Sequence, residues 1–220
     1  MSESNPLPVL LVCGCQKYLP YLHAGIRRYS RPTHWRTIGF LGEPTASTAT
    51  FDEVSSVLTL PVADTYEDLP QKIRAAIAWV QSQWPSTPGI FKTDDDIVIP
   101  DLDCLNAAIQ SHIAARTPYA GLYVSTCRDG TAASHRIETR FTDKQRAGTY
   151  KGAHYCYGAG YWLSTEAMQV AVAAEQEYGS ACLEDVCTGY VMNCAGIKPV
   201  KINVRYKERV RDDALLTSFA

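Results

Sequence analysis

Three consecutive carboxylates, Asp94, Asp95 and Asp96, stand between two apolar runs at residues 89–91 and 97–99. Apolar runs of this length beside glycine and proline are typical of a buried strand, so the acids are expected where a sheet strand reaches the surface. Adjacent carboxylates repel one another, and burying them in part costs free energy unless a cation compensates. A hard divalent ion with oxygen ligands would do so, and would keep positions open for a phosphate-bearing substrate. The alternative is a solvated acidic turn, and the flanking strand pattern favours the metal site over it.

A second pair of carboxylates, Glu184 and Asp185, opens the last expected helix. The helix dipole alone favours carboxylates in a first turn, and this explains most such pairs. The alternative is that one of the two is a general base, held in place by the rigid start of the helix. The pair by itself leaves both interpretations open.

The run at residues 155–162 combines aromatic side chains with glycine and alanine. As a structural feature, it would be a strand with stacked aromatic side chains in the core. As a binding feature, it would be a wall where the backbone approaches a ligand closely and aromatic faces meet sugar rings. Gly14 follows the first expected strand without a Gly-x-Gly-x-x-Gly pattern, which argues against a nicotinamide or flavin enzyme.

Buried strands and amphipathic helices alternate over most of the chain. Strands are expected at residues 9–13, 37–41, 56–60 and 120–126 and leading into the acid triplet, and helices around residues 22–29, 68–84, 102–113, 164–179 and 183–194. This alternation predicts an α/β fold with a mostly parallel central sheet and helices on both faces. Ligands bind beyond the carboxyl ends of strands in such sheets, and the acid triplet occupies such an end.

Length and composition indicate one domain over residues 1–220, with residues 1–8 and 212–220 as flexible ends and residues 128–153 as a long surface loop. A net charge of -2 lacks the basic footprint that nucleic-acid binding needs. No segment resembles a signal peptide or a membrane span, so a cytoplasmic location is expected. The eight cysteines include no Cys-x-x-Cys pair, which favours free thiols.

The tail at residues 198–211 carries six basic residues against one acid. On a strand, Lys201, Arg205 and Lys207 would point to one face, because strand side chains alternate in direction. Two interpretations stay open: a solvated final strand, and a positive face that helps to hold a diphosphate.

Several sequence blocks between residues 9 and 200, taken in order, resemble glycosyltransferase family 31, the group of beta-1,3-galactosyltransferases and N-acetylglucosaminyltransferases. Three blocks are specific in combination: Lys92-Thr93-Asp94-Asp95-Asp96, residues 155–164, and Leu183-Glu184-Asp185-Val186. Looser matches are Ile26-Arg27-Arg28 before Trp35, Phe40-Leu41-Gly42, and the segment that runs from Asp64 through Lys72 to Trp79.

The resemblance implies a GT-A fold, a UDP-sugar donor, a glycan acceptor, manganese or magnesium, and inversion at the anomeric carbon. It implies that Asp94 and Asp96 bind the metal and that Asp185 is the catalytic base. Contacts with the donor nucleotide are expected for Arg27, Arg28, Lys92, Asp94, Asp95 and Asp96. The pocket for the donor sugar and the acceptor is expected to include Tyr157, Gly158, Ala159, Gly160, Tyr161, Trp162, Glu184 and Asp185.

The chain also departs from the family in features that bear on the site. Family members can supply a metal-binding histidine after the Glu-Asp-Val helix, whereas this chain has no histidine beyond His154. Metal coordination would then rest on the acid triplet, the donor diphosphate and water. Residues 134–151 are rewritten, which leaves the choice of acceptor open. A retaining transferase of the same fold, a catalytically weak sugar-binding module and a nucleotidyltransferase remain as alternatives, and the absence of a glycine- and lysine-rich phosphate loop disfavours the last.

Overall fold

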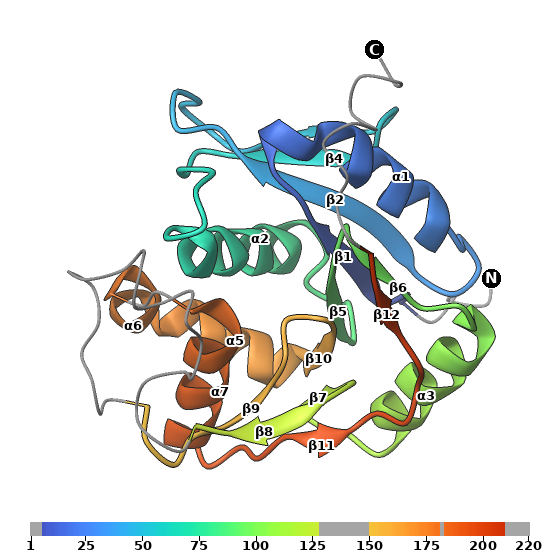
Figure 1. The fold of residues 1–220 in the computed structure, drawn as a ribbon, viewed down its shortest axis with the longest axis vertical. Coiled ribbons are helices and arrows are strands. Elements are labelled where there is room, and N and C mark those ends of the chain that lie inside the picture. The colour runs from blue at the N-terminus through green and yellow to red at the C-terminus, as the bar shows by residue number, and fades with distance from the viewer. Residues whose placement is uncertain (1–5, 128–149, 181–182, 210–220) are drawn as a thin grey trace.

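The structure, a computed structural model, describes residues 6–127, 150–180 and 183–209, and strands and helices alternate along it (Figure 1). The strands are β1 (Val9–Cys13), β2 (Arg36–Gly42), β3 (Thr50–Asp52), β4 (Val57–Leu60), β5 (Gly89–Asp94), β6 (Ile97–Val98), β7 (Tyr119–Gly121), β8 (Val124–Thr126), β9 (His154–Cys156), β10 (Tyr161–Ser164), β11 (Val200–Lys201) and β12 (Lys207–Glu208). The helices are α1 (Leu19–Tyr29), α2 (Leu69–Gln83), α3 (Leu102–Ala114), α5 (Thr165–Ala173), α6 (Glu175–Ser180) and α7 (Glu184–Cys194), with a short 3-10 helix at Gln16–Tyr18.

An eight-stranded sheet with the strand order β11-β7-β10-β5-β1-β2-β4-β3 forms the centre of the fold. Its middle strands β5, β1, β2 and β4 are parallel, whereas β10 runs antiparallel to both of its neighbours. Strands β1 and β5 lie side by side, with Cys13 opposite Asp94. The acid triplet therefore leaves the sheet at the carboxyl ends of its parallel strands, and the predicted α/β fold with a mostly parallel sheet is confirmed.

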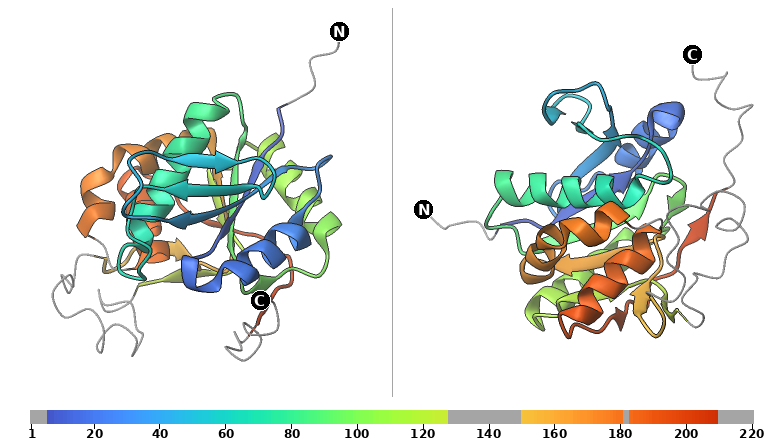
Figure 2. Two further views of the ribbon diagram at one scale, coloured as in Figure 1. Left: turned by 90° about the horizontal axis from the view of Figure 1, so that it is seen from above. Right: turned by 90° about the vertical axis from the view of Figure 1, so that its left-hand side faces the viewer.

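Two helical layers cover the sheet (Figure 1). Helices α1 and α3 pack on one face, and α2, α5 and α7 pack on the other, where α2 and α5 lie side by side (Figure 2). Successive residues of β1 enter opposite layers, Leu10 and Val12 on the α1 side and Leu11 on the α2 side, because strand side chains alternate in direction. All five residues of β1 are buried, so an unbroken apolar run marks this strand in the sequence.

Two segments that the sequence presents as continuous strands are each split between two sheets. Residues 120–126 divide into β7, in the central sheet, and β8, which pairs with β9 in a separate two-stranded sheet. The aromatic run divides into β9 and β10, which are joined by a turn at residues 157–160. A Cβ on Gly160 would lie 2.8 Å from both Leu122 and Phe91, so glycine lets this turn rest directly on the core.

The helix expected at residues 164–179 is broken at Ala174, whose ψ of 46° is not helical. Arg74 of α2 donates to the carbonyl of Val172 at 3.0 Å and so supplies a partner for the end of α5. After the break, Tyr178 of α6 is fully buried. These contacts come from distant parts of the chain, and the local helical period does not reveal them.

The basic tail forms two short strands instead of one. Strand β11 pairs with β7, and β12 pairs with β6 directly after the acid triplet. Ile202 and Val204 between them are buried, whereas Lys201, Arg205 and Lys207 are exposed. Val200 and Glu208, their neighbours on β11 and β12, are exposed as well, so a single basic face stays a prediction.

All seven cysteines that the structure describes are free, as the sequence predicts. Among the helices of the described residues, none is long and apolar enough to cross a membrane. Residues 128–149 of the expected surface loop, and residues 1–5 and 210–220 at the expected flexible ends, lie outside the described part of the chain.

Candidate active site

The acid triplet forms the turn between β5 and β6. Asp94 and Asp96 are half-buried, whereas Asp95 between them is fully buried. The N–H of Asp95 donates to the carbonyl of Cys13 at 3.0 Å, which ties the turn to the end of β1. A ligand in solvent can therefore reach the two outer carboxylates, and the structure does not bring Asp95 to the surface where a nucleotide contact was predicted.

Arg28 of α1 forms hydrogen bonds with the backbone at the acid turn. Its Nη1 donates to the carbonyl of Ile97 at 2.8 Å and lies 3.4 Å from the carbonyl of Asp95. Arg27, one residue earlier, is exposed on α1. Of the two arginines predicted to contact the nucleotide, Arg28 is thus the one that reaches the acid turn, and its contacts are with the backbone of the turn.

Lys92 is the buried centre of the site, with an exposed fraction of 1%. Its ammonium lies 2.8 Å from Asp94 Oδ1, 2.9 Å from the carbonyl of Gly158 and 3.3 Å from Glu184 Oε2. Burial alone would lower the pKa of Lys92, but the carboxylates of Asp94 and Glu184 raise it well above its ordinary value. A lysine has three N–H donors, and all three find acceptors here, so Lys92 holds neighbouring groups of the protein in position. Its contact with the nucleotide stays a prediction.

Glu184 is held from three sides and only 4% exposed. Its carboxylate accepts hydrogen bonds from the hydroxyls of Tyr161 and Thr188 in addition to the contact with Lys92. Buried polar groups are stable only when they are paired in this way. Glu184 therefore fixes the start of α7. Because its carboxylate is buried and already paired, an acceptor hydroxyl in solvent cannot reach it.

Asp185, the next residue, is half-buried and turned toward the aromatic run. Its Oδ2 accepts a hydrogen bond from the N–H of Gly158 at 3.2 Å, and its Oδ1 accepts one from the N–H of Val186 at 2.8 Å. Burial, and next the charge of Glu184, raise the pKa of Asp185 to about 6. The carboxylate is ionised at neutral pH and is more basic than an ordinary aspartate, which suits a general base.

A close approach between α7 and β9 brings Asp185 to this position. A Cβ on Gly189 would lie only 2.2 Å from Cβ of Tyr155 and 2.7 Å from the carbonyl of His154. A larger residue on this face of α7 would push the helix away from the strand. The glycine therefore lets the rigid first turn of α7 hold Asp185 beside Gly158.

The surface part of the aromatic run consists of Tyr157 and Gly158. Tyr157 is 37% exposed, and Gly158 is half-buried. A Cβ on Gly158 would lie 3.5 Å from Asp94 Oδ2, so this glycine faces the acid turn on one side while its N–H contacts Asp185 on the other. The structure thus brings these two predicted pocket residues together with Asp94 and Asp185.

The other predicted pocket residues of the run, Ala159, Gly160, Tyr161 and Trp162, are buried. Trp162 donates its indole N–H to the carbonyl of Thr117 at 3.0 Å, and Tyr161 donates to Glu184. A buried side chain cannot contact a ligand in solvent. The structure therefore does not bring these four to the pocket surface, and they support the turn from the core.

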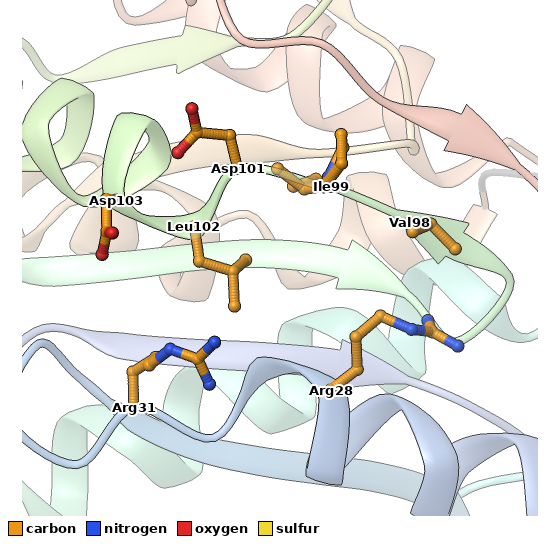
Figure 3. Close-up of a pocket in the computed structure, with 8 residues that line it drawn as sticks. Arg28, Arg31, Val98, Ile99, Asp101, Leu102 and Asp103 are labelled. Carbon is orange, nitrogen blue, oxygen red and sulfur yellow. The ribbon is translucent and has the colours of Figure 1, made fainter.

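A cavity of about 630 Å³ lies between the end of α1 and the start of α3 (Figure 3). Its lining residues are Arg28, Arg31, Val98, Ile99, Pro100, Asp101, Leu102 and Asp103. Figure 3 shows the two arginines on one wall and the two aspartates on the other. The lining of this cavity does not include Asp94, Asp96 or Asp185. We therefore place the reacting groups at the acid turn and not in this cavity.

Asp94 and Asp96 fit the ligand set of a hard divalent cation. Magnesium and manganese are commonly bound through one or two carboxylates, with substrate phosphates and water in the other positions. Two half-exposed carboxylates at a strand end match this pattern, and Lys92 contacts one oxygen of Asp94. In the described ranges, no group of three His, Cys, Asp or Glu residues is placed so that it could hold a metal ion.

Comparison with known proteins identifies the family. The family model described as Galactosyltransferase matches residues 50–203, which include the acid turn, the aromatic run and α7 but not Arg27 and Arg28. Among solved structures, the chain is similar to the "crystal structure of a glycosyltransferase involved in the glycosylation of the major capsid of PBCV-1", with a TM-score of 0.53 and 12% sequence identity over 98% of this chain and 100% of that chain. At this identity the likeness concerns the fold. A search of curated proteins gave no significant match. Since the family model covers well over half of the residues, the chain belongs to the galactosyltransferase family and is a glycosyltransferase, as the sequence blocks predict.

Proposed function

We propose that this glycosyltransferase moves a hexosyl unit, of the galactose or N-acetylhexosamine type, from a UDP-sugar to a hydroxyl of a glycan acceptor. The reaction requires a divalent metal, manganese or magnesium, and inverts the anomeric carbon. Asp94 and Asp96 are the protein ligands of the metal, and Asp185 is the general base.

The observation that carries the proposal is the connection between Asp94 and Asp185 through Lys92 and Gly158. Lys92 holds Asp94 at 2.8 Å and the carbonyl of Gly158 at 2.9 Å, and the N–H of Gly158 holds Asp185 at 3.2 Å. An inverting displacement needs its base and its leaving group on opposite sides of the reacting carbon. The carboxylates proposed to hold the metal lie on one side of Gly158 and a basic carboxylate lies on the other, which supports this arrangement.

In the proposed reaction, Asp185 accepts the proton of the acceptor hydroxyl while that oxygen forms a bond to the anomeric carbon. The bond from this carbon to the diphosphate breaks, and UDP leaves with the electron pair. Asp94 and Asp96 would hold a divalent cation, which would supply positive charge to offset the charge on the departing diphosphate. Lys92 and Glu184 hold the acid turn, Gly158 and α7 in register, so that these groups need little rearrangement during the reaction.

A donor screen tests the proposed function. The full chain would be incubated with manganese and UDP-galactose, UDP-N-acetylglucosamine, UDP-glucose or GDP-mannose, and the released nucleotide would be measured with and without EDTA. We expect release from at least one UDP-sugar, and loss of that release when EDTA removes the metal. Equal release in the presence of EDTA would contradict metal dependence, and no release from any donor would contradict the transferase reaction.

The raised pKa of Asp185 predicts opposite effects of pH on activity and on stability. The base must be ionised, so kcat/KM should rise about tenfold per pH unit below about pH 6 and level off above it. Because its pKa is raised in the folded state, protonated Asp185 holds its proton more tightly in the folded protein than in the unfolded chain. The stabilisation from this site is therefore fully present below about pH 4, the ordinary range, and is lost as pH rises through about 6. Initial rates at low acceptor concentration from pH 4.5 to 8 would check the first effect, and a kcat/KM that stays flat across this range would contradict it.

A further inference from the structure

Tyrosine side chains gather on one face of the small sheet formed by β8 and β9. Tyr155 and Tyr157 are two residues apart, and residues at this spacing point to the same side of an extended chain. Their rings stack with an interplanar angle of 16° and centroids 5.5 Å apart. Tyr123, which precedes β8, lies across from Tyr157, whose N–H donates to the carbonyl of Tyr123 at 3.0 Å. The ring centroids of Tyr123 and Tyr157 are 4.5 Å apart, so the three tyrosines form one contiguous cluster of rings, the tyrosine platform.

The opposite face of the same sheet belongs to the core. Cys156, between the two stacked tyrosines, is fully buried, and its strand partner Val124 packs against the same core cluster. On the platform face, Tyr123 is 46% exposed and Tyr157 is 37% exposed, whereas Tyr155 is half-buried where α7 packs against it at Gly189. The rings of Tyr123 and Tyr157 thus contact both each other and water. A ligand that covered them would gain about 25 cal/mol for each Å² of apolar area removed from water.

The platform adjoins both halves of the candidate active site. Tyr157 directly precedes Gly158, whose N–H binds Asp185. A Cβ on Gly189, one turn after Asp185 on α7, would lie 2.2 Å from Cβ of Tyr155, so Tyr155 packs against the helix that carries the base. On the other side, burial and then the charges of Glu208, Tyr157 and Tyr123 raise the pKa of Tyr206, so Tyr206 lies within electrostatic range of the platform.

Tyr206 also connects the platform with the acid turn. It immediately precedes β12, which pairs with β6, and the N–H of Arg209 donates to the carbonyl of Asp96 at 2.7 Å. The aromatic surface therefore extends from the base at Asp185 toward the turn that carries Asp96. A substrate group next to the base, on the side away from the buried core, would lie against these rings.

We propose that Tyr123, Tyr155 and Tyr157 form the acceptor subsite, where the terminal pyranose ring of the acceptor stacks on the exposed aromatic faces and presents its hydroxyl to Asp185. This inference rests on the proposed function, since it takes Asp185 as the base. A pyranose ring has C–H groups on its faces and hydroxyls at its edge, and a tyrosine offers an apolar ring face with a polar tip. The platform thus selects an acceptor that is itself a sugar, in preference to a serine or threonine hydroxyl of a polypeptide, which has no ring to stack.

Binding measurements test this subsite without requiring turnover. Saturation-transfer NMR would be recorded with methyl β-D-galactopyranoside, methyl N-acetyl-β-D-glucosaminide and N-acetylserinamide as probes, in the presence of manganese and UDP. The wild-type chain would be compared with Tyr123→Ala and Tyr157→Ala, and with the matched variants Tyr123→Phe and Tyr157→Phe, which keep the ring. Since both side chains are exposed, the alanine variants should fold, and their melting temperatures check this.

We expect transfer to the ring C–H protons of at least one pyranoside, and none to N-acetylserinamide. The dissociation constant of that pyranoside should rise by roughly tenfold in each alanine variant, as for an aromatic contact removed from a binding site, and by less than about threefold in the phenylalanine variants. Unchanged pyranoside binding in both alanine variants, binding of the serine probe alone, or binding of no probe would overturn the subsite. Nucleotide release by the wild-type chain tests the proposed function separately. If the wild-type chain releases nucleotide but pyranoside binding is unchanged when Tyr123 or Tyr157 is replaced, this inference is refuted and the proposed function is not.

Discussion

Replacing Asp185 with asparagine is expected to slow sugar transfer by roughly a hundredfold or more, because the variant cannot accept the proton of the acceptor hydroxyl. The amide oxygen of asparagine can still accept the hydrogen bond that Gly158 donates at 3.2 Å, so the turn should keep its shape. The loss should appear in kcat, while the affinity for UDP, measured by calorimetry, stays within about twofold of the wild-type value.

Asp103→Asn is a matched control for this variant. Asp103 is also a carboxylate in the first turn of a helix, α3, but it is exposed and lies in the wall of the separate cavity. Its replacement should leave the rate of transfer unchanged. If Asp185→Asn transferred sugar about as fast as Asp103→Asn, Asp185 would not be the base and would only stabilise the start of α7. This result would favour a retaining mechanism.

Replacing Asp96 with alanine is expected to abolish metal-dependent turnover, since Asp94 and Asp96 are the accessible carboxylates of the acid turn. A second readout does not need activity. A ligand at about a hundred times its dissociation constant stabilises a protein by about 2.7 kcal/mol, which for a chain of this size corresponds to a rise of about 5–10 °C in melting temperature. Manganese with UDP should produce such a rise in the wild-type chain and little or none in Asp96→Ala.

Asp103→Ala again serves as the control, because it removes an exposed carboxylate from outside the acid turn. It should keep the full thermal shift. The melting temperature of Asp96→Ala without ligands should stay close to that of the wild-type chain, which separates loss of the metal site from loss of the fold. Equal shifts in the wild-type chain and in Asp96→Ala would contradict the assignment of the metal site.

The local pattern of the sequence was sufficient to predict which carboxylates lie at the end of a strand or at the start of a helix. The apolar run before Asp94 identifies a buried strand, and the periodic helix after Glu184 identifies a helix start. Side chains at such ends are positioned by their own element, so their place in the fold follows from the sequence. The alternation of strands and helices predicted the sheet for the same reason.

The role of Lys92 could not be predicted in this way. Asp94 lies two residues after Lys92 on β5, but the other two partners of Lys92, Gly158 and Glu184, are 66 and 92 residues away in the sequence. The antiparallel insertion of β10 beside β5 brings the turn that carries Gly158 next to Lys92. A lysine before an acid triplet suggests a charge available for a phosphate. In the structure, its ammonium pairs with groups inside the protein.

The sequence predicted Tyr157 as a pocket residue but not its association with Tyr123 and Tyr155 in the tyrosine platform, for a related reason. The i, i+2 spacing of Tyr155 and Tyr157 was a signal that both rings share one face. Their partner Tyr123, however, is identified only through the register of β8 with β9, which no local pattern specifies. The split of residues 120–126 between two sheets hid that register, because a single continuous strand would have remained in the central sheet.

The configuration of the new glycosidic bond tests the central claim most directly, since it depends on a base opposite the leaving group. The full chain would be incubated with manganese, the UDP-hexose that supports the fastest nucleotide release, and a pyranoside acceptor. The anomeric proton of the product would be observed by NMR from the first turnovers onward. From an α-linked UDP-hexose, the arrangement of Asp185, Gly158 and Asp94 predicts a β-linked product. An α-linked product would contradict inversion, and with it the role of Asp185 as the base.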